Sequence, residues 1–246
     1  MIASAVKSIR AQVINLQPVR WLVYGFIRVV LGIVCRVDSG DLTKIPARGP
    51  LILISNHTGS VEVPLLFTWL YPRPVTGWAK VETWDNPVMG WLFDLWGAIP
   101  LRRGEADMSA LRTALEKLQE GYILGVAPEG TRNRNGRLLR AYPGVVPLAI
   151  RSGAPILPLV HWGGENLFSN LKRLRRTNFS MRVGKPFMLN IKGERLTREQ
   201  RQQVVDEMMY QMAALLPEEY RGEYSDMSKA TVQYLSLDPP CGSASD

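Results

Sequence analysis

The chain has 246 residues, of which 46% are hydrophobic and 21% charged, so it can bury a sizeable core in one main domain without disulfides. Two isolated cysteines, Cys35 and Cys241, and two histidines give neither a disulfide framework nor metal-ligand spacing. A reduced, cytosolic environment without a metal is expected. The net charge of +8 requires an anionic partner, which could be nucleic acid, an anionic membrane face or a phosphorylated substrate.

The first 36 residues are predicted to form a helical pair that associates with a membrane. Apolar residues recur at helical spacing over residues 2–16, and Pro18 ends that amphipathic helix. The apolar run at 21–35 contains Arg28, and as a helix it would reach about 22 Å, against about 30 Å of hydrocarbon core. A pair lying in the membrane interface is therefore favoured over a span. The alternative is a helical hairpin packed on the domain itself.

From residue 50 onward, short apolar runs alternate with helical segments. Strands are predicted at residues 50–55, 74–79, 97–101, 122–127, 154–160 and 179–184. A helix that Asp107 or Ser109 could cap follows the third strand, and another spans 197–215 with Thr197 and Gln200 in a capping box. This order predicts an α/β fold whose central, mixed, largely parallel sheet is flanked by helices.

The chain is thus divided into three parts. Residues 1–36 are the membrane-associating pair, residues 37–216 are the main domain, and residues 217–246 are a polar tail that is expected to be disordered.

A titratable pair follows the first of these strands. In the stretch LILISNHTGSVEVPLL, residues 51–66, His57 comes at the strand end and Glu62 five residues later. A carboxylate at that spacing can fix the imidazole tautomer and leave the other ring nitrogen to take a proton from a hydroxyl. By itself this is a weak signal, since a histidine and a glutamate often merely flank a helix start.

Three further stretches strengthen the interpretation: GAIPLRRG at 97–104, VAPEGTRNRNGRL at 126–138 and GAPILPLV at 153–160. In this order they resemble the glycerolphosphate acyltransferase superfamily, specifically 1-acylglycerol-3-phosphate acyltransferases and their lysophospholipid relatives. That family has the blocks N-H-x4-D, G-x-I-x-x-x-R, P-E-G-T-R and P-I-x-P. The resemblance covers residues 50–185, about half of the chain.

The resemblance implies that His57 is the general base and Glu62 its orienting partner. It also implies that the second and third blocks hold the glycerol phosphate of the acceptor. The residues concerned are Arg102, Arg103, Glu129, Gly130, Thr131 and Arg132. Guanidinium groups can bind phosphate oxygens in a fork, and backbone N–H groups near Gly130 can add donors. Glu129 could accept from an acceptor hydroxyl or hold an arginine, while a solvated strand end and a surface turn are the alternatives for these blocks.

The chain departs from the family pattern in three places. Glu62 stands where the family has aspartate, and Ala127 replaces a bulky aromatic before Pro-Glu-Gly. The stretch AYPG at 141–144 lacks a lysine that is common before that glycine. These departures leave the acceptor open, and a neutral or differently phosphorylated lipid hydroxyl remains an alternative.

The function implied by the resemblance is O-acyl transfer on the cytoplasmic face of a membrane. A fatty acyl chain would move from acyl-CoA or acyl-carrier protein to a lipid hydroxyl, with 1-acylglycerol-3-phosphate as the leading acceptor and phosphatidic acid as product. No cofactor, metal or covalent enzyme intermediate is implied. The expected partners are membrane lipids, the lysophospholipid acceptor and the thioester donor, with no nucleic acid.

Two alternatives stay open. A serine esterase could use Ser60 as nucleophile and HWGG at 161–164 as an oxyanion loop, although Ser60 lacks the G-x-S-x-G context. His161 itself is expected near the edge of the site. A non-catalytic lipid-binding relative could instead use the basic cluster LKRLRR at 171–176, for which a solvated face is the ordinary explanation.

Overall fold

The computed structural model describes residues 17–59, 61–104, 107–191 and 196–237. Its centre is a seven-stranded sheet in the order β1-β7-β6-β2-β5-β3-β4, in which only the β6–β7 pair is antiparallel. The strands are β1 (Cys35–Asp38), β2 (Leu51–Ser55), β3 (Val75–Lys80), β4 (Ile99–Leu101), β5 (Ile123–Val126), β6 (Ile156–Trp162) and β7 (Thr177–Val183). A separate two-stranded sheet pairs β8 (Met188–Leu189) with β9 (Leu235–Ser236). The predicted mixed, largely parallel α/β class is confirmed, and each of the six predicted strands is present.

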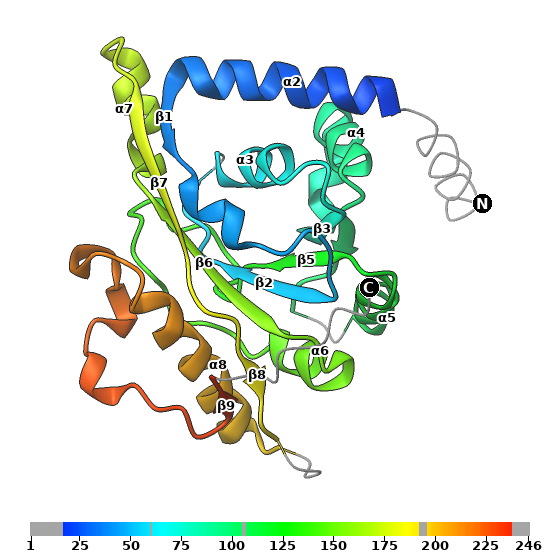
Figure 1. The fold of residues 1–246 in the computed structure, drawn as a ribbon, viewed down its shortest axis with the longest axis vertical. Helices are drawn as coiled ribbons and strands as arrows, with labels where there is room; N and C mark the ends of the chain where they lie inside the picture. The colour runs from blue at the N-terminus through cyan, green and yellow to red at the C-terminus, as the bar shows by residue number, and fades with distance from the viewer. Residues whose placement is uncertain (1–16, 60, 105–106, 192–195, 238–246) are drawn as a thin grey trace.

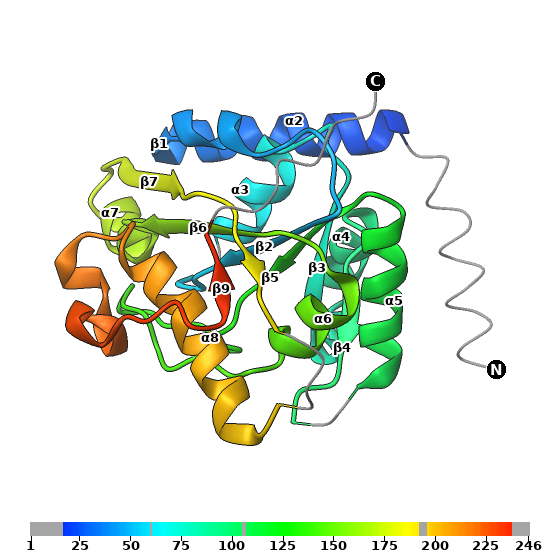
Figure 2. The same ribbon diagram turned by 60° about the horizontal axis from the view of Figure 1, so that its bottom comes forward.

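Helices cover both faces of the sheet (Figure 1). They are α2 (Gln17–Val34), α3 (Glu62–Trp69), α4 (Pro87–Leu95), α5 (Met108–Gln119), α6 (Val145–Ser152), α7 (Leu167–Lys172) and α8 (Arg198–Ala213). Figure 2 shows α2 and α3 on one side of the sheet and α6 and α8 on the other. Successive side chains of a strand point to opposite faces, so β2 serves two cores. Ile52 and Ile54 pack with α5, α6 and α8, whereas Leu51 and Leu53 pack toward α3.

The predicted helix ends agree with the capping that is observed. Asp107, not Ser109, caps α5, because its carboxylate accepts the N–H of Ala110 at 3.0 Å. The capping box of α8 is present as predicted: Thr197 accepts from the N–H of Gln200, and the Gln200 side chain accepts from the N–H of Thr197. Each such cap satisfies N–H groups that have no partner within the helix.

The prediction of a disordered tail after residue 217 is wrong for 217–237. Tyr224 is buried in the main core and donates to Asp206 Oδ1 at 2.8 Å, and Leu235 is buried in β9. The average composition of the segment is polar, but its few apolar residues pack against the core. Their burial stabilises the ordered segment. Residues 238–246 lie outside the described part of the chain.

Helix α2 packs along the domain and also presents an apolar surface to solvent. Tyr24 and Leu31 are buried against α3 and its neighbours, and the Arg28 guanidinium lies 5.1 Å from the centre of the Trp69 ring. The opposite side, termed the α2 apolar face, consists of Trp21, Leu22, Phe26, Val29, Val30 and Ile33.

Judged by length and composition only, α2 is long and apolar enough to cross a membrane. Pro18 lies in its first turn, where a missing N–H leaves no hydrogen bond unmade. One face of α2 therefore packs on the domain, as the alternative to membrane association expected for this helix. The first predicted helix, residues 2–16, lies outside the described residues.

Candidate active site

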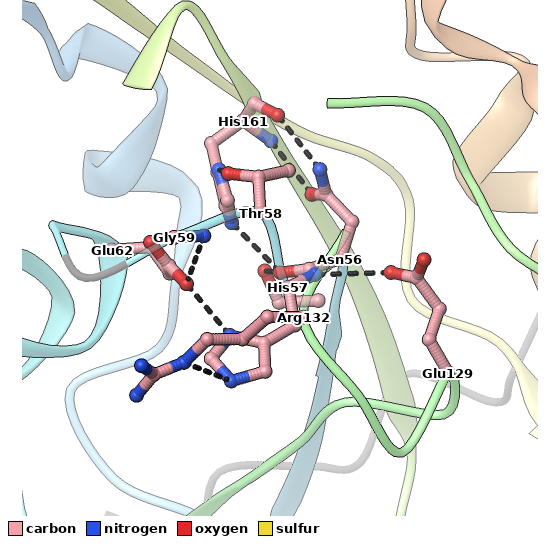
Figure 3. Close-up of polar contacts among 9 residues, drawn as sticks. Asn56, His57, Thr58, Gly59, Glu62, Glu129, Arg132 and His161 are labelled. Atoms are coloured by element: carbon pink, nitrogen blue, oxygen red, sulfur yellow. Dashed lines mark hydrogen bonds and ion pairs between the residues drawn. The ribbon is translucent and has the colours of Figure 1, made fainter. Parts of the chain in front are cut away.

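The candidate catalytic turn connects the carboxyl end of β2 to α3, and Figure 3 shows its polar contacts. Ligand clefts of parallel sheets form at such strand ends. His57 lies just after β2, and Glu62 is the first residue of α3. The His57 Nδ1 atom lies 2.6 Å from Glu62 Oε1, and the Gly59 N–H donates to the same oxygen at 3.0 Å. The structure therefore brings together the pair that the spacing predicted.

The hydrogen bonds of the His57 ring determine its tautomer. Arg132 Nε donates to His57 Nε2 at 3.2 Å, and because an arginine can only donate, Nε2 must be the acceptor. The ring proton is therefore on Nδ1, which donates to Glu62. A lone pair on Nε2 is what a general base requires.

The charge of Glu62 is maintained by its neighbours. Burial raises the pKa of this carboxyl, but the hydrogen bond from His57 and the nearby His161 and His57 rings outweigh burial and lower the pKa to about 2. Glu62 is consequently ionised at neutral pH. A fixed negative charge beside Nδ1 stabilises the imidazolium that forms when Nε2 takes a proton.

A buried pair behind the turn holds it to β6. The Asn56 side chain donates to the His161 carbonyl at 2.8 Å and accepts the His161 N–H at 3.0 Å. The His161 ring donates through Nε2 to the Asn56 carbonyl at 2.7 Å. Burial lowers the pKa of His161, against the opposing effect of the Glu62 charge. The expectation that His161 lies near the edge of the site is wrong, since it is fully buried behind the turn.

Glu129 is a second support of the turn. Its side chain is 1% exposed, and its two oxygens accept the backbone N–H groups of His57 at 3.0 Å and Leu139 at 2.8 Å. The Asn133 N–H in turn donates to the His57 carbonyl at 2.8 Å. The burial of Glu129 does not agree with a surface turn, and its predicted role in binding the acceptor stays a prediction. The structure makes Glu129 a positioning residue for the backbone of His57.

A pH dependence of folding follows from Glu129. Burial raises the pKa of its carboxyl from 4.5 to about 7, and the charge of Glu62 adds to the rise against the two backbone hydrogen bonds. The folded protein thus binds this proton more tightly than the unfolded chain. The contribution of the Glu129 proton to the free energy of unfolding is therefore complete below about pH 4.5. It is lost as the pH rises through about 7.

Glu129→Gln should remove this titration and leave one backbone N–H facing an amide NH₂, at a cost of about 1–3 kcal/mol. The wild type should exceed the variant in free energy of unfolding most below about pH 4.5 and least above about pH 7. Denaturant unfolding of both proteins across that range measures the difference. Glu116→Gln, the same change on the exposed surface of α5, is the control. A difference that does not vary with pH would contradict the titration of Glu129.

A cavity of about 330 Å³ opens beside His57, between the sheet and helices α3 and α4. Its interior is apolar and is lined by Leu53, Val63, Leu66, Phe67, Val75 and Phe93. Gly77 and Gly125 also line it, on the paired strands β3 and β5. A Cβ at Gly77 would lie 2.9 Å from the Gly125 carbonyl oxygen, so the close approach of the two strands requires glycine at position 77.

Three basic side chains line the same cavity: Lys80, Arg103 and Arg132. Arg103 lies just after β4, and Arg132 belongs to the loop after β5. Arg102 does not line the cavity, so the structure separates the two adjacent arginines. The motifs do not indicate Lys80, although its place just after the strand predicted at 74–79 is a usable signal.

The remaining third-block residues, Gly130 and Thr131, also line the cavity. Gly130 has a φ of 65°, in the left-handed region that favours glycine, and this lets the loop turn back toward His57. Ser60, the alternative nucleophile, lies outside the described residues. The roles assigned to the site residues in substrate binding stay predictions.

Fold and site together define an α/β protein with a histidine–carboxylate pair beside a cavity that is lined by apolar side chains and by three basic ones. Residues 36–162, just over half of the chain, match the family model described as Acyltransferase. The chain belongs to this acyltransferase family, as the ordered motifs indicated.

Several curated relatives are similar to the chain. A 1-acyl-sn-glycerol-3-phosphate acyltransferase of Limnanthes douglasii is 32% identical over 58% of this chain and 50% of its own. A lyso-ornithine lipid O-acyltransferase of Pseudomonas aeruginosa is 34% identical over 52% and 55%. A 1-acyl-sn-glycerol-3-phosphate acyltransferase of Bacillus subtilis is 28% identical over 59% and 74%. The chain thus spans about half the length of the first two.

A solved structure has the same fold. It is the crystal structure of the 1-acyl-sn-glycerophosphate (LPA) acyltransferase PlsC from Thermotoga maritima, with a TM-score of 0.55, 24% identity and 79% of each chain covered. At this identity the similarity shows the fold alone.

Proposed function

We propose that the protein is an O-acyltransferase that transfers a fatty acyl chain from a thioester donor to the hydroxyl of 1-acylglycerol-3-phosphate, giving phosphatidic acid. The observation that carries the proposal is the His57–Glu62 pair, with Nε2 unprotonated, at a cavity that is lined by apolar side chains and by three basic ones. The names of the Limnanthes and Bacillus relatives support the same acceptor.

The geometry supports a general-base mechanism. The acceptor hydroxyl replaces Arg132 as the partner of His57 Nε2, which takes its proton as the oxygen attacks the thioester carbonyl. Glu62 stabilises the imidazolium while the tetrahedral intermediate exists. The carbon–sulfur bond then breaks, and the thiol leaves with the proton returned from Nε2. General-base assistance of this kind contributes about 10²- to 10⁴-fold in rate.

The cavity suits an amphiphilic substrate. Its apolar interior removes hydrocarbon from water, which is worth about 25 cal/mol per Å² of buried surface. Arg103, Arg132 and Lys80 supply the positive charge that a phosphate requires, and guanidinium groups can bind it in a fork. Acyl-CoA and acyl-carrier protein are both soluble donors, so the proposal includes either and places the site on the cytoplasmic face.

Membrane association is part of the proposal. The α2 apolar face is exposed in the free protein, and the opposite face of α2 packs on α3 and is held by the Arg28–Trp69 contact. A helix fastened to the domain along its length suits the membrane interface better than a span. The site would then act on lysolipid drawn from the same leaflet.

Arg103→Ala should weaken the use of a phosphate-bearing acceptor. Losing one charged hydrogen bond of about 1.5–3 kcal/mol should raise the KM for lysophosphatidic acid about 10- to 150-fold, with a smaller change in kcat. Arg102→Ala is the matched control, because the adjacent arginine does not line the cavity and should leave KM within about twofold. Steady-state assays with a fixed donor measure both. An unchanged KM in Arg103→Ala would mean that this arginine does not hold phosphate.

The proposed activity is tested by transfer of a labelled acyl chain to a panel of lysolipids. Acyl-CoA and acyl-carrier protein are supplied in parallel, and the panel includes lysophosphatidic acid and, because of the Pseudomonas relative, lyso-ornithine lipid. Transfer to lysophosphatidic acid supports the proposal, and transfer only to an acceptor without phosphate would change the acceptor. No transfer from either donor by folded protein would favour the non-catalytic lipid-binding alternative. Labelling by a fluorophosphonate probe would favour the serine esterase.

A further inference from the structure

Helix α7 and the turn that joins it to β7 carry apolar and basic side chains that the proposed chemistry does not use. We term residues 168–176 the α7 turn. Its apolar members are Phe168, 66% exposed, Leu171, 38% exposed, and Leu174, 97% exposed. Lys172, Arg173 and Arg175 stand exposed among them, and within the described residues none of these three forms an ion pair.

Leu174 has a backbone conformation that leucine rarely adopts. It is the only residue other than glycine with a positive φ, at 53°, among those the structure describes. The N–H of Leu174 bonds to the Leu171 carbonyl at 3.0 Å and the N–H of Arg175 to the Asn170 carbonyl at 2.9 Å, which closes the end of α7. Glycine is the usual residue at such a position, because a side chain there strains the backbone.

Packing among the described residues does not compensate the strain at Leu174. The side chain is almost fully exposed, so the leucine buries no apolar surface on folding. A glycine would form the same turn at lower cost. The leucine therefore makes physical sense only if it is removed from water by something outside the described fold.

The α7 turn is attached to the carboxyl end of α2. Arg176 donates to the carbonyls of Gly32 at 2.6 Å and Cys35 at 2.7 Å, at the carboxyl end of α2. Figure 1 shows the loop between α7 and β7 beside that end of α2. The α7 turn, with its exposed apolar residues, thus lies beside one end of α2, the helix that carries the α2 apolar face.

We propose that the α7 turn is a second lipid contact, which inserts Leu174 and Phe168 into the interface of an anionic leaflet and places Lys172, Arg173 and Arg175 against lipid phosphates. Exposed apolar side chains surrounded by basic ones are the combination that binds anionic bilayers. The inference rests on the proposed membrane association of α2. Contacts along α2 and beside its carboxyl end fix how the domain, and with it the cavity, is oriented on the leaflet.

A fluorescent reporter at position 174 tests insertion directly. Leu174→Cys in a Cys241→Ser background is labelled with an environment-sensitive dye, Cys35 being buried. Vesicles of phosphatidylcholine with about 30% phosphatidylglycerol should shift the emission to the blue. The same label at Met108→Cys, an exposed residue at the start of α5, should keep its aqueous emission. A water-like spectrum at position 174 on vesicle-bound protein would overturn the proposal.

Leu174→Gly separates lipid contact from folding. The variant relieves the backbone strain, so its thermal midpoint should equal or exceed that of the wild type. Its affinity for the anionic vesicles should nevertheless fall several-fold, because apolar insertion is lost. An unchanged affinity with an unchanged fold would overturn insertion of Leu174. A clear loss of thermal stability would also count against the proposal, since it would give the leucine a structural role.

The charges are tested by a triple variant and a matched control. The test variant is Lys172→Gln, Arg173→Gln, Arg175→Gln, and the control is Arg112→Gln, Lys185→Gln, Arg198→Gln, three exposed positions elsewhere. The test variant should bind anionic vesicles about 10- to 100-fold more weakly, and the control should change little. Equal losses would mean that only net charge matters and would overturn the site. The lipid site would also be overturned if the test variant lost binding to nucleic acid but bound the vesicles as tightly as the wild type.

Acyl transfer to a short-chain, monomeric acceptor keeps this inference distinct from the proposed catalysis. The α7 variants should retain that transfer while they lose vesicle affinity, since the turn does not line the cavity. Wild-type protein that inserts position 174 but transfers no acyl chain would support the lipid contact and contradict the catalysis. Wild-type protein that transfers acyl chains but does not sediment with anionic vesicles would overturn the lipid contact alone.

Discussion

His57→Ala is expected to abolish nearly all acyl transfer while the fold is retained. The ring supplies the base atom Nε2, and loss of general-base assistance costs about 10²- to 10⁴-fold in kcat. The bonds that hold the turn are made by the backbone of His57, to Glu129 and Asn133, and alanine keeps them. The measurements are steady-state transfer of a labelled acyl chain and thermal unfolding of the same preparations.

A matched control for this loss is Thr58→Ala, one residue along the same turn. The Thr58 hydroxyl only reaches His161 Nδ1 at 3.5 Å, so a small change in turnover is expected there. Retention of a tenth or more of wild-type turnover by a folded His57→Ala protein would exclude the general-base role.

Glu62→Gln is expected to reduce transfer by orders of magnitude, on the order of 10²- to 10⁴-fold. Glutamine keeps the size of the side chain but removes the charge that stabilises the imidazolium, and its NH₂ group can donate to Nδ1 and so favour the wrong tautomer. The pKa of Glu62 is about 2, so the wild-type carboxylate stays ionised throughout an ordinary assay range. The loss in Glu62→Gln should therefore vary little with pH.

Glu62→Asp tests whether this turn is built for glutamate. One glutamate oxygen lies 2.6 Å from His57 Nδ1 and 3.0 Å from the Gly59 nitrogen, and aspartate would be one carbon–carbon bond short of both. A misplacement near 1 Å can cost about 10²-fold, so activity should fall although aspartate is the residue of the family motif. The thermal midpoint should change little in comparison with the activity.

The two Glu62 variants are decisive as a pair, with Glu116→Gln on the exposed surface of α5 as the control for loss of charge. Reduced activity in both supports an oriented, charged carboxylate. If Glu62→Asp and Glu62→Gln are both as active as wild type, the carboxylate plays no catalytic part. The His57 dyad should then be abandoned in favour of a non-catalytic lipid-binding protein.

The features that sequence alone determined are those carried by short segments. The presence and order of the strands, the capping box of α8 and the mixed α/β class follow from local periodicity and capping chemistry. The His57–Glu62 pair was predictable because five residues of one turn bring the two side chains together. The ordered motifs then named the family, and the family model confirmed it.

Other properties were decided only by tertiary structure, because they join residues far apart in the chain. Motif identity placed Glu129 with the substrate, but packing buries it beneath the backbone of His57, 72 residues earlier. His161 is 105 residues from Asn56, and no local pattern shows that β6 passes behind the turn. Adjacent arginines look alike in sequence, yet the direction of the chain after β4 gives only Arg103 access to the cavity. The burial and orientation of these side chains depend on how the strands pair across the sheet, and no single segment of the sequence determines that pairing.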